Sequence, residues 1–373
     1  MDPQRPAGVM KSAQSPPRKI LIVKLSAIGD VIQSLPMLKA LRRKFPEAQI
    51  DWVTEEESAG ILKGYPGIDR VLVSRRKSWQ KSIREKGKFR ATLREILRFV
   101  RELRETPYDW VIDNHGVLKS GILVALSRGR RKIGYRATAG IADEGSYLFT
   151  HERRQPLSIE RHALERYLDL VEQLGVPIKG IELEFPITPD SLKSVQRILN
   201  GRGFNVHPLA VIHPFAKWDT KQWSWEKFAR LSDRLAEKGV RMVFTGSRGD
   251  ANAVEKILSQ TRFPAQVLNL AGRTDLGELA ALFSLADLVI SPDTGPMHLA
   301  AAVKAPLIAL FGPTAPWRTG PYGTGQIILR KALSCSPCFR KKCPTRECLD
   351  QITVEEVANA AEEKLRERRV PWP

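Results

Sequence analysis

The chain has 373 residues, 42% of them hydrophobic, and its 60 Lys and Arg exceed its 41 Asp and Glu by a net charge of +19. That much apolar side chain excludes wholesale disorder, and no apolar run reaches the roughly 18 residues of a membrane-spanning helix. The length predicts two domains, or one large one. Residues 1–17 are polar and proline-rich without the apolar stretch of a signal peptide, so we expect a disordered leader and a cytoplasmic protein.

The excess positive charge is concentrated in three stretches, 75–105, 128–136 and 330–346, and the rest of the chain is close to neutral. Such clusters suit a polyanion: nucleic acid, an anionic membrane surface or a phosphorylated substrate. For the first stretch an alternative is a single solvated helix face with weak intrahelical ion pairs.

Short apolar runs alternate with helical patterns in the first half of the chain. The predicted strands are Lys19–Leu25, Ile50–Val53, Val71–Val73, Trp110–Asp113 and Ile133–Tyr135. A helix with a kink or restart at Pro36 is predicted after the first strand, and a second helical stretch over Lys77–Arg104.

A second series of the same kind follows a stretch rich in Gly and Pro, Gly175–Pro189. Its predicted strands are Leu209–His213, Arg241–Thr245, Gln266–Leu270, Leu288–Ser291 and Leu307–Phe311, and its helices are Ser224–Lys238, Asp250–Gln260, Leu276–Leu285, Gly295–Val303 and Val354–Arg369. The alternation indicates two α/β domains, each a doubly wound parallel sheet, at 18–180 and 181–350, with 351–373 as a C-terminal helix. Ligands bind at the carboxyl ends of strands in this architecture, so we expect a central cleft.

The residues Ser26-Ala27-Ile28-Gly29-Asp30 directly follow the first predicted strand. Gly29 permits a tight turn, and Asp30 is expected near a helix N-terminus. Its carboxylate is either a helix cap or a general base that faces the cleft. The motif lacks the Gly-x-Gly-x-x-Gly pattern, which argues against a nicotinamide-dependent dehydrogenase.

Two later loops end at the same predicted edge of the second sheet. In Ser291–His298 (SPDTGPMH), Asp293 or Thr294 can cap a helix whose first N–H groups suit a diphosphate, and Gly295 lets a ligand approach the backbone. His298 is either a further donor or a core histidine. The other loop, His213–Trp223, carries Lys221, whose charge would neutralise a leaving phosphate.

All four cysteines of the chain lie close together, at Cys335, Cys338, Cys343 and Cys348. Thiols this close in sequence are typical of a structural zinc site, although their spacing is irregular for common zinc folds. A redox-sensitive pair and four reduced thiols that hold no metal are the alternatives.

The segments Lys19–Pro36 (KILIVKLSAIGDVIQSLP), Val111–Ser120 (VIDNHGVLKS), Lys221–Trp223 and Ser291–Ala302 (SPDTGPMHLAAA) resemble the lipopolysaccharide heptosyltransferases of glycosyltransferase family 9. The resemblance runs from about Lys19 to the C-terminal helix. It implies the GT-B fold, two Rossmann-like domains that face a central cleft. It also implies an inverting, metal-independent transfer of heptose from ADP-heptose to the lipopolysaccharide inner core, Kdo-lipid A or heptosyl-Kdo-lipid A, with no required cofactor.

The resemblance also implies roles for individual residues. Asp30 would deprotonate the acceptor hydroxyl, and Lys221 would stabilise the departing diphosphate. Asp293, Thr294 and Gly295 would hold the donor phosphates, with His298 beside them. Asp250 is the nearest match to a glutamate that contacts the donor ribose in the family, and is one methylene shorter. Arg75, Arg76, Lys77 and Lys119 lie where the family meets its anionic acceptor.

The expected partners are a nucleotide sugar, an anionic glycolipid and the inner leaflet of the cytoplasmic membrane, which the enzyme would contact peripherally. Another nucleotide sugar or acceptor within the family is one alternative, because residues that hold phosphates do not identify a sugar. A basic nucleic-acid-binding protein is the alternative from another class. We expect no nucleic acid, because no zinc-finger, RNP or helix-turn-helix signature accompanies the charge.

Overall fold

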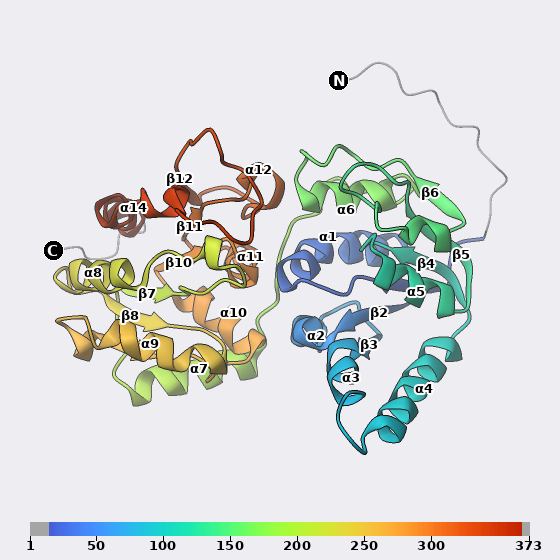
Figure 1. The fold of residues 1–373 in the computed structure, drawn as a ribbon, viewed down its shortest axis with the longest axis horizontal. Coiled ribbons are helices and arrows are strands. Elements are labelled where there is room, and N and C mark those ends of the chain that lie inside the picture. The colour runs from blue at the N-terminus through green and yellow to red at the C-terminus, as the bar shows by residue number, and fades with distance from the viewer. Residues whose placement is uncertain (1–14, 368–373) are drawn as a thin grey trace.

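The computed structural model describes residues 15–367, and two parallel six-stranded sheets form its framework (Figure 1). The strand order is β3-β2-β1-β4-β5-β6 in one sheet and β12-β11-β10-β7-β8-β9 in the other. Crossover helices connect the strands, as parallel pairing requires. The prediction of two doubly wound α/β units is therefore confirmed.

The first unit contains strands β1 (Lys19–Val23), β2 (Gln49–Glu55), β3 (Arg70–Ser74), β4 (Tyr108–Asp113), β5 (Gly129–Tyr135) and β6 (Glu152–Arg154). Its helices are α1 (Ile28–Lys44), α2 (Glu56–Leu62), α3 (Arg76–Ser82), α4 (Phe89–Glu105), α5 (Leu118–Leu126) and α6 (Ala163–Glu172), with a 3-10 turn, η1 (Ser146–Phe149).

The second unit contains strands β7 (Leu209–Ile212), β8 (Arg241–Phe244), β9 (Val267–Asn269), β10 (Leu288–Pro292), β11 (Leu307–Phe311) and β12 (Ile327–Arg330). Its helices are α7 (Pro189–Gly201), α8 (Trp225–Ala236), α9 (Ala251–Leu258), α10 (Leu276–Leu285), α11 (Gly295–Ala302), α12 (Pro316–Thr319), α13 (Glu347–Asp350) and α14 (Val354–Glu367), with 3-10 turns η2 (Asp219–Lys221), η3 (Arg248–Asp250) and η4 (Pro264–Gln266). The chain passes from one unit to the other between α6 and α7.

One expectation about helices is wrong. The stretch predicted as one helix over Lys77–Arg104 is two helices, α3 and α4, and Gly87 lies between them with φ +81°, a left-handed conformation that interrupts a helix. At Pro36, where a kink or a restart was expected, α1 continues without a restart, and the kink stays a prediction.

The C-terminal helix α14 packs on α8 and so belongs to the second unit. Its predicted end at Arg369 and the predicted leader up to residue 14 lie outside the described residues. Within residues 15–367, no helix is both long and apolar enough to cross a bilayer.

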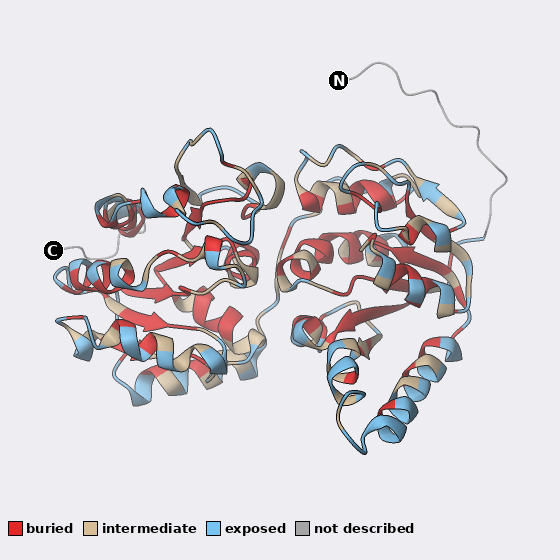
Figure 2. Cartoon of the chain, viewed as in Figure 1, coloured by how far each residue is buried: buried red, intermediate tan, exposed pale blue. Residues whose placement is uncertain are grey.

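Each sheet is covered by helices on both faces, and the buried side chains concentrate on the strands between them (Figure 2). Along β1, Ile20 and Ile22 point to the layer of α1, α2 and α6, whereas Leu21 and Val23 point to the layer of α3, α4 and α5. The strand is therefore buried on both faces, which explains its continuous apolar run. The core on the α1 side continues without a break into the helices α7, α10 and α11 of the second unit.

The two units meet where the N-terminus of α1 packs against the N-terminus of α11. A Cβ on Gly29 would lie 2.3 Å from Cδ2 of His298, and a Cβ on Gly295 would lie 2.8 Å from Cβ of Ile28. Both distances are far below van der Waals contact. Gly29 was expected to serve a tight turn; it lies inside α1 and is needed because His298 comes so close.

We predict that Gly29→Ala lowers the turnover number about a hundredfold while the protein stays folded. The added methyl group must push α1 away from α11, and a shift of about 1 Å between reacting groups costs on this order. Gly201→Ala is the matched control, because a Cβ there meets nothing within 4 Å. Steady-state kinetics and thermal unfolding test this, and equal turnover of the two variants would show that the contact does not position the site.

Candidate active site at the junction of the two units

Asp30 lies in the first turn of α1, at the carboxyl end of β1. Its Oδ2 accepts a hydrogen bond from the backbone N–H of Ala27 at 3.1 Å, and its Oδ1 accepts one from the hydroxyl of Tyr167 at 2.7 Å. The first contact is a helix cap, so this half of the expectation is met. The second contact comes from α6, far along the chain, and orients the carboxylate.

A buried lysine keeps Asp30 ionised. Lys24 lies at the end of β1, where its Nζ donates to the carbonyl oxygen of Asn114 at 3.1 Å and sits 3.8 Å from the ring centre of Tyr167. Burial lowers the pKa of Lys24 to about 8. Burial pushes the pKa of Asp30 upward, but the charge of Lys24 and the hydrogen bond from Tyr167 outweigh it, so the pKa of Asp30 lies below its usual value.

We predict that Lys24→Met moves the acid limb of the rate–pH profile to higher pH. The substitution removes a contribution that lowers the pKa of Asp30 and leaves the burial that raises it, so the carboxylate becomes protonated at a higher pH. A base must be unprotonated to act. The measurement is kcat/KM against pH, with Lys19→Met at the other end of β1 as the control. An acid limb at the same pH in both variants would contradict the coupling between Lys24 and Asp30.

On the other side of the junction, Lys221 in η2 forms an ion pair with Asp293, with Nζ 2.6 Å from Oδ2. The same carboxylate oxygen accepts a hydrogen bond from Oγ1 of Thr314, also at 2.6 Å. Both charged side chains are largely buried, with 17% and 6% of their surface exposed. Asp293 therefore fixes the position of Lys221.

Asp293 leads into α11, which begins at Gly295 with Thr294 as its N-cap. The first N–H groups of a helix have no intrahelical partner, and the helix dipole favours an anion there. Lys221 is thus held beside a helix N-terminus, and the two together form a site suited to a phosphate group.

His298 joins the two halves of the site. Its Nδ1 lies 3.0 Å from the side-chain amide Nε2 of Gln33 on α1. The amide can only donate, so Nδ1 accepts and the ring proton sits on Nε2. Burial lowers the pKa of His298 to about 4, and the charges of Asp293, Asp30 and Lys221 all act on it. The histidine is therefore neutral and lies among the charged groups of both units.

Asp250 closes the turn that follows β8. Its Oδ2 accepts hydrogen bonds from the backbone N–H of Ser247 at 2.7 Å and from the Ser247 hydroxyl at 2.6 Å. The Asp250 side chain thus caps the 3-10 turn η3 in this structure, and its contact with a ribose stays a prediction.

The four basic residues that were expected to contact the acceptor lie close together. They form ion pairs with three glutamates, Glu55, Glu56 and Glu57, for which no role was expected. Arg76 and Lys119 both contact Oε1 of Glu55, at 3.2 and 3.0 Å. Arg75 pairs with Glu56 at 2.7 Å and Lys77 with Glu57 at 2.6 Å. Glu55 is 3% exposed, and its Oε2 has no hydrogen bond. The cluster holds its cations in place at the end of β2.

Asp113, the last residue of β4, is a further buried carboxylate. Asp113 accepts hydrogen bonds from the backbone N–H groups of His115 and Gly116 and from the hydroxyl of Ser120. Burial raises its pKa to about 6 and lowers that of His115 to about 3. The hydrogen bonds to Asp113 hold the loop after β4 in place. They account for the polar residues within the segment Val111–Ser120.

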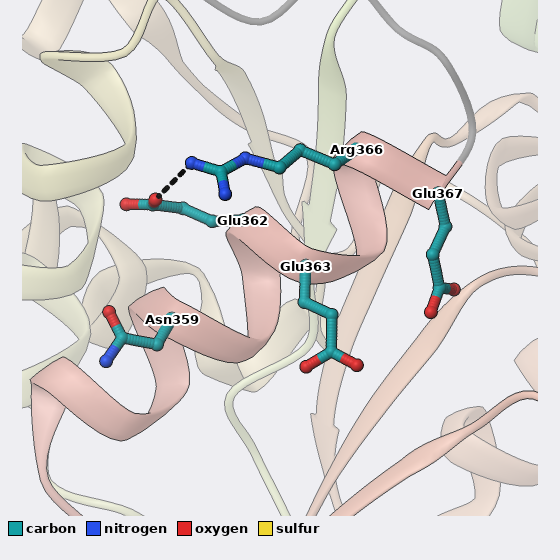
Figure 3. Close-up of a pocket in the computed structure, with 5 residues that line it drawn as sticks. All are labelled: Asn359, Glu362, Glu363, Arg366 and Glu367. Carbon is teal, nitrogen blue, oxygen red and sulfur yellow. Dashed lines mark ion pairs between the residues drawn. The ribbon is translucent and has the colours of Figure 1, made fainter.

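The surface has several hollows, and one of them is lined by Tyr167, the residue whose hydroxyl donates to Asp30. It measures about 180 Å³ and is lined by residues of the β4–α5 loop, the loop after β5 and α6, among them His115, Arg166 and Tyr167. Another hollow, on α14, contains none of the expected site residues. There, Arg366 pairs with Glu362 at 3.5 Å along one face of the helix (Figure 3).

The cysteines lie on the loop after β12 and on α13. Among the described residues, no three histidine, cysteine or acidic side chains are grouped closely enough to hold a metal ion. The four thiols are free, with Cys335 exposed and Cys348 buried. The zinc site expected from their spacing stays a prediction, as do its two alternatives.

Comparison with known proteins identifies the family. Residues 96–349 match the model of glycosyltransferase family 9 (heptosyltransferase). The lipopolysaccharide heptosyltransferase 1 of Pseudomonas aeruginosa is 32% identical over 349 residues, 88% of this chain and 89% of that protein. The chain belongs to glycosyltransferase family 9. It is therefore a glycosyltransferase.

Solved structures of the family share the fold. The E. coli heptosyltransferase WaaC with ADP has a TM-score of 0.74 at 27% identity, over 93% of this chain and 99% of that chain. The same enzyme with ADP-2-deoxy-2-fluoro heptose has a TM-score of 0.72 at 28% identity, over 92% and 99%. The expected GT-B arrangement of two Rossmann-like units is confirmed.

Proposed function

We propose that this family 9 enzyme transfers heptose from ADP-heptose to the inner core of lipopolysaccharide, with inversion at the anomeric carbon. One observation carries the proposal: an ionised carboxylate, Asp30, and a lysine beside a helix N-terminus, Lys221, lie on opposite sides of the α1–α11 junction. The name of the Pseudomonas relative and the ligands of the WaaC structures support the choice of substrates.

The arrangement suits a single displacement. The acceptor hydroxyl gives its proton to Asp30 as its oxygen forms a bond to the anomeric carbon of the sugar, and the bond from that carbon to the diphosphate oxygen breaks. ADP leaves with the bonding electron pair. Attack and departure on opposite faces of the sugar invert its configuration, and a base on one wall with cations on the other provides for this.

The donor phosphates are assigned to the start of α11. The backbone N–H groups of Thr294 and Gly295 would bind them, and Lys221 would turn from Asp293 to the β-phosphate as negative charge develops. His298, with its proton on Nε2, is a neutral donor in the same place. Asp250, in the turn after β8, is assigned to the ribose.

The acceptor is assigned to the first unit, as Kdo-lipid A or its heptosylated form. The hollow beside Tyr167 is lined by Arg166. A guanidinium group in the wall of a hollow favours an acceptor with a carboxylate or phosphate group. The cations around Glu55 would provide further contacts for such an acceptor.

We also propose that transfer needs no metal, because Lys221 and the start of α11 suffice for the leaving group. The acceptor's lipid anchor places the enzyme at the inner leaflet, and the basic surface serves that contact and not nucleic acid. A chelator should leave the turnover number unchanged.

The proposal is tested with a panel of nucleotide sugars, each offered with an inner-core acceptor while release of the nucleotide is followed. We expect turnover with ADP-heptose and at least about a hundredfold less with UDP-glucose. Turnover with another nucleotide sugar alone would reassign the donor and keep the class of enzyme.

A further inference from the structure

Helix α4 exposes an apolar stripe to solvent beside a row of arginines. The stripe consists of Phe89, Leu93 and Leu97, spaced by four residues, and the row consists of Arg90, Arg94, Arg98 and Arg101. We call these seven residues the α4 face. Their spacing places the stripe along one side of the helix for two turns, about 12 Å, with the arginines on the adjoining side.

Nothing in the described part of the chain covers the stripe. Phe89 is 56% exposed, Leu93 43% and Leu97 55%, whereas Phe99 and Leu103 of the same helix are buried against the sheet. The packing of α4 on its own unit therefore uses other residues. A run of three large, exposed, apolar side chains on one helix indicates an interaction surface.

The basic and acidic side chains of the helix differ in their partners. None of Arg90, Arg94, Arg98 and Arg101 forms an ion pair within residues 15–367. The acidic side chains lie away from the stripe and have partners in the fold. Glu95 accepts a hydrogen bond from the indole of Trp79 at 3.1 Å, and Glu102 lies 3.8 Å from Arg70. The α4 face is thus apolar and positive with no acidic residue in it.

The α4 face is close to the acceptor side of the site. Helix α3 packs against α4 and begins with the cations around Glu55, and α5 beside it exposes Leu118 and Ile122. In Figure 1, α3 and α4 lie together at the lower end of the first unit, and in Figure 2 much of α4 is pale blue.

We propose that the α4 face binds the surface of an anionic phospholipid bilayer and so holds the enzyme where its acceptor is anchored. A helix with Phe and Leu on one side and arginines next to them lies in the plane of the interface, with its apolar side chains among the upper acyl chains. Each arginine adds attraction to anionic headgroups. The inference rests on the proposed function, because a lipid-linked acceptor is what makes the location useful.

The test uses the full chain in flotation with vesicles of phosphatidylethanolamine and phosphatidylglycerol, and with vesicles of phosphatidylcholine alone. We expect the wild type to float with the anionic vesicles only. Leu93→Gln/Leu97→Gln and Arg94→Gln/Arg98→Gln should each weaken vesicle binding about tenfold or more. The double variant Lys193→Gln/Arg197→Gln on α7 is the control for lost charge, and Val206→Gln is the control for a lost exposed apolar side chain.

The α4 variants should keep wild-type turnover on a delipidated, water-soluble acceptor and lose it on an acceptor embedded in vesicles. Equal flotation of the wild type with both kinds of vesicle, or unchanged flotation of both α4 variants, would overturn the inference. A dimer that these substitutions dissociate, with flotation unchanged, would assign the face to a second copy of the chain. Flotation as expected without release of nucleotide from any sugar donor would overturn the proposed function alone.

Discussion

Replacing Asp30 with asparagine is expected to lower the turnover number about a thousandfold and to leave the affinity for ADP-heptose within about twofold of the wild type. Asparagine keeps an oxygen for the hydrogen bond from Ala27, so α1 still begins at the same place, but it cannot take a proton. General-base catalysis contributes a factor of this size. Single-turnover kinetics and calorimetric titration with the donor separate the two effects.

Tyr167→Phe is the matched control for this prediction. It keeps the ring under Lys24 and removes only the hydroxyl that donates to Asp30, so the carboxylate can still act as a base. We expect a loss of tenfold or less and an acid limb at higher pH, because one of the contributions that lower the pKa of Asp30 is gone. Wild-type turnover in the Asp30→Asn variant would rule out Asp30 as the base.

Replacing Lys221 with alanine has the second largest expected effect, a loss of about a hundredfold or more in turnover. The departing diphosphate loses its cation, and only the N-terminus of α11 still stabilises the negative charge. The same substitution leaves Asp293 buried without its partner, which costs about 3 kcal/mol of folding free energy. We therefore expect a lower Tm as well as slower transfer.

The double variant Lys221→Ala/Asp293→Asn separates catalysis from stability. It removes the unpaired carboxylate, so the melting temperature should recover, while turnover should stay low because no cation has been restored. Lys238→Ala, at the exposed end of α8, is the control for the loss of a lysine elsewhere. Recovery of turnover together with stability would show that Lys221 only balances the charge of Asp293.

Much of the framework could be predicted from sequence because buried parallel strands are continuous apolar runs. The runs at Lys19–Val23 and Leu307–Phe311 are of this kind, and both are strands of the structure. The edge strands β6 and β12 were missed, since Glu152–Arg154 is charged and Ile327–Arg330 is only partly buried. The break between α3 and α4 depends on the backbone conformation of a single glycine, which periodicity does not reveal.

Some residues of the candidate site could also be predicted from sequence, and others could not. Asp293 directly follows a strand, and Asp30 and Lys221 lie in the connections that follow β1 and β7, so their placement at a sheet edge could be predicted. Tyr167 could not, because it lies on a helix 137 positions away in the chain and meets Asp30 only through packing. Lys24 did leave a signal that was overlooked, a charged residue between the apolar residues Val23 and Leu25 at the end of the apolar run. Such a lysine is buried beside an anion or beside a ligand.

The close contact between α1 and α11 was also beyond sequence reasoning. Gly29 and Gly295 each have local explanations, in a turn and in a phosphate loop. Their shared purpose, to let two helix N-termini from different units meet at His298, needs the relative placement of both units.

ADP release and the anomeric configuration of the product can be followed in one reaction of ADP-heptose with an inner-core acceptor. We expect one ADP for each heptose linked, no release without the acceptor, and a product whose anomeric configuration, determined by NMR, is opposite to that of the donor. A product of retained configuration, or ADP release that does not depend on the acceptor, would contradict a single displacement assisted by Asp30.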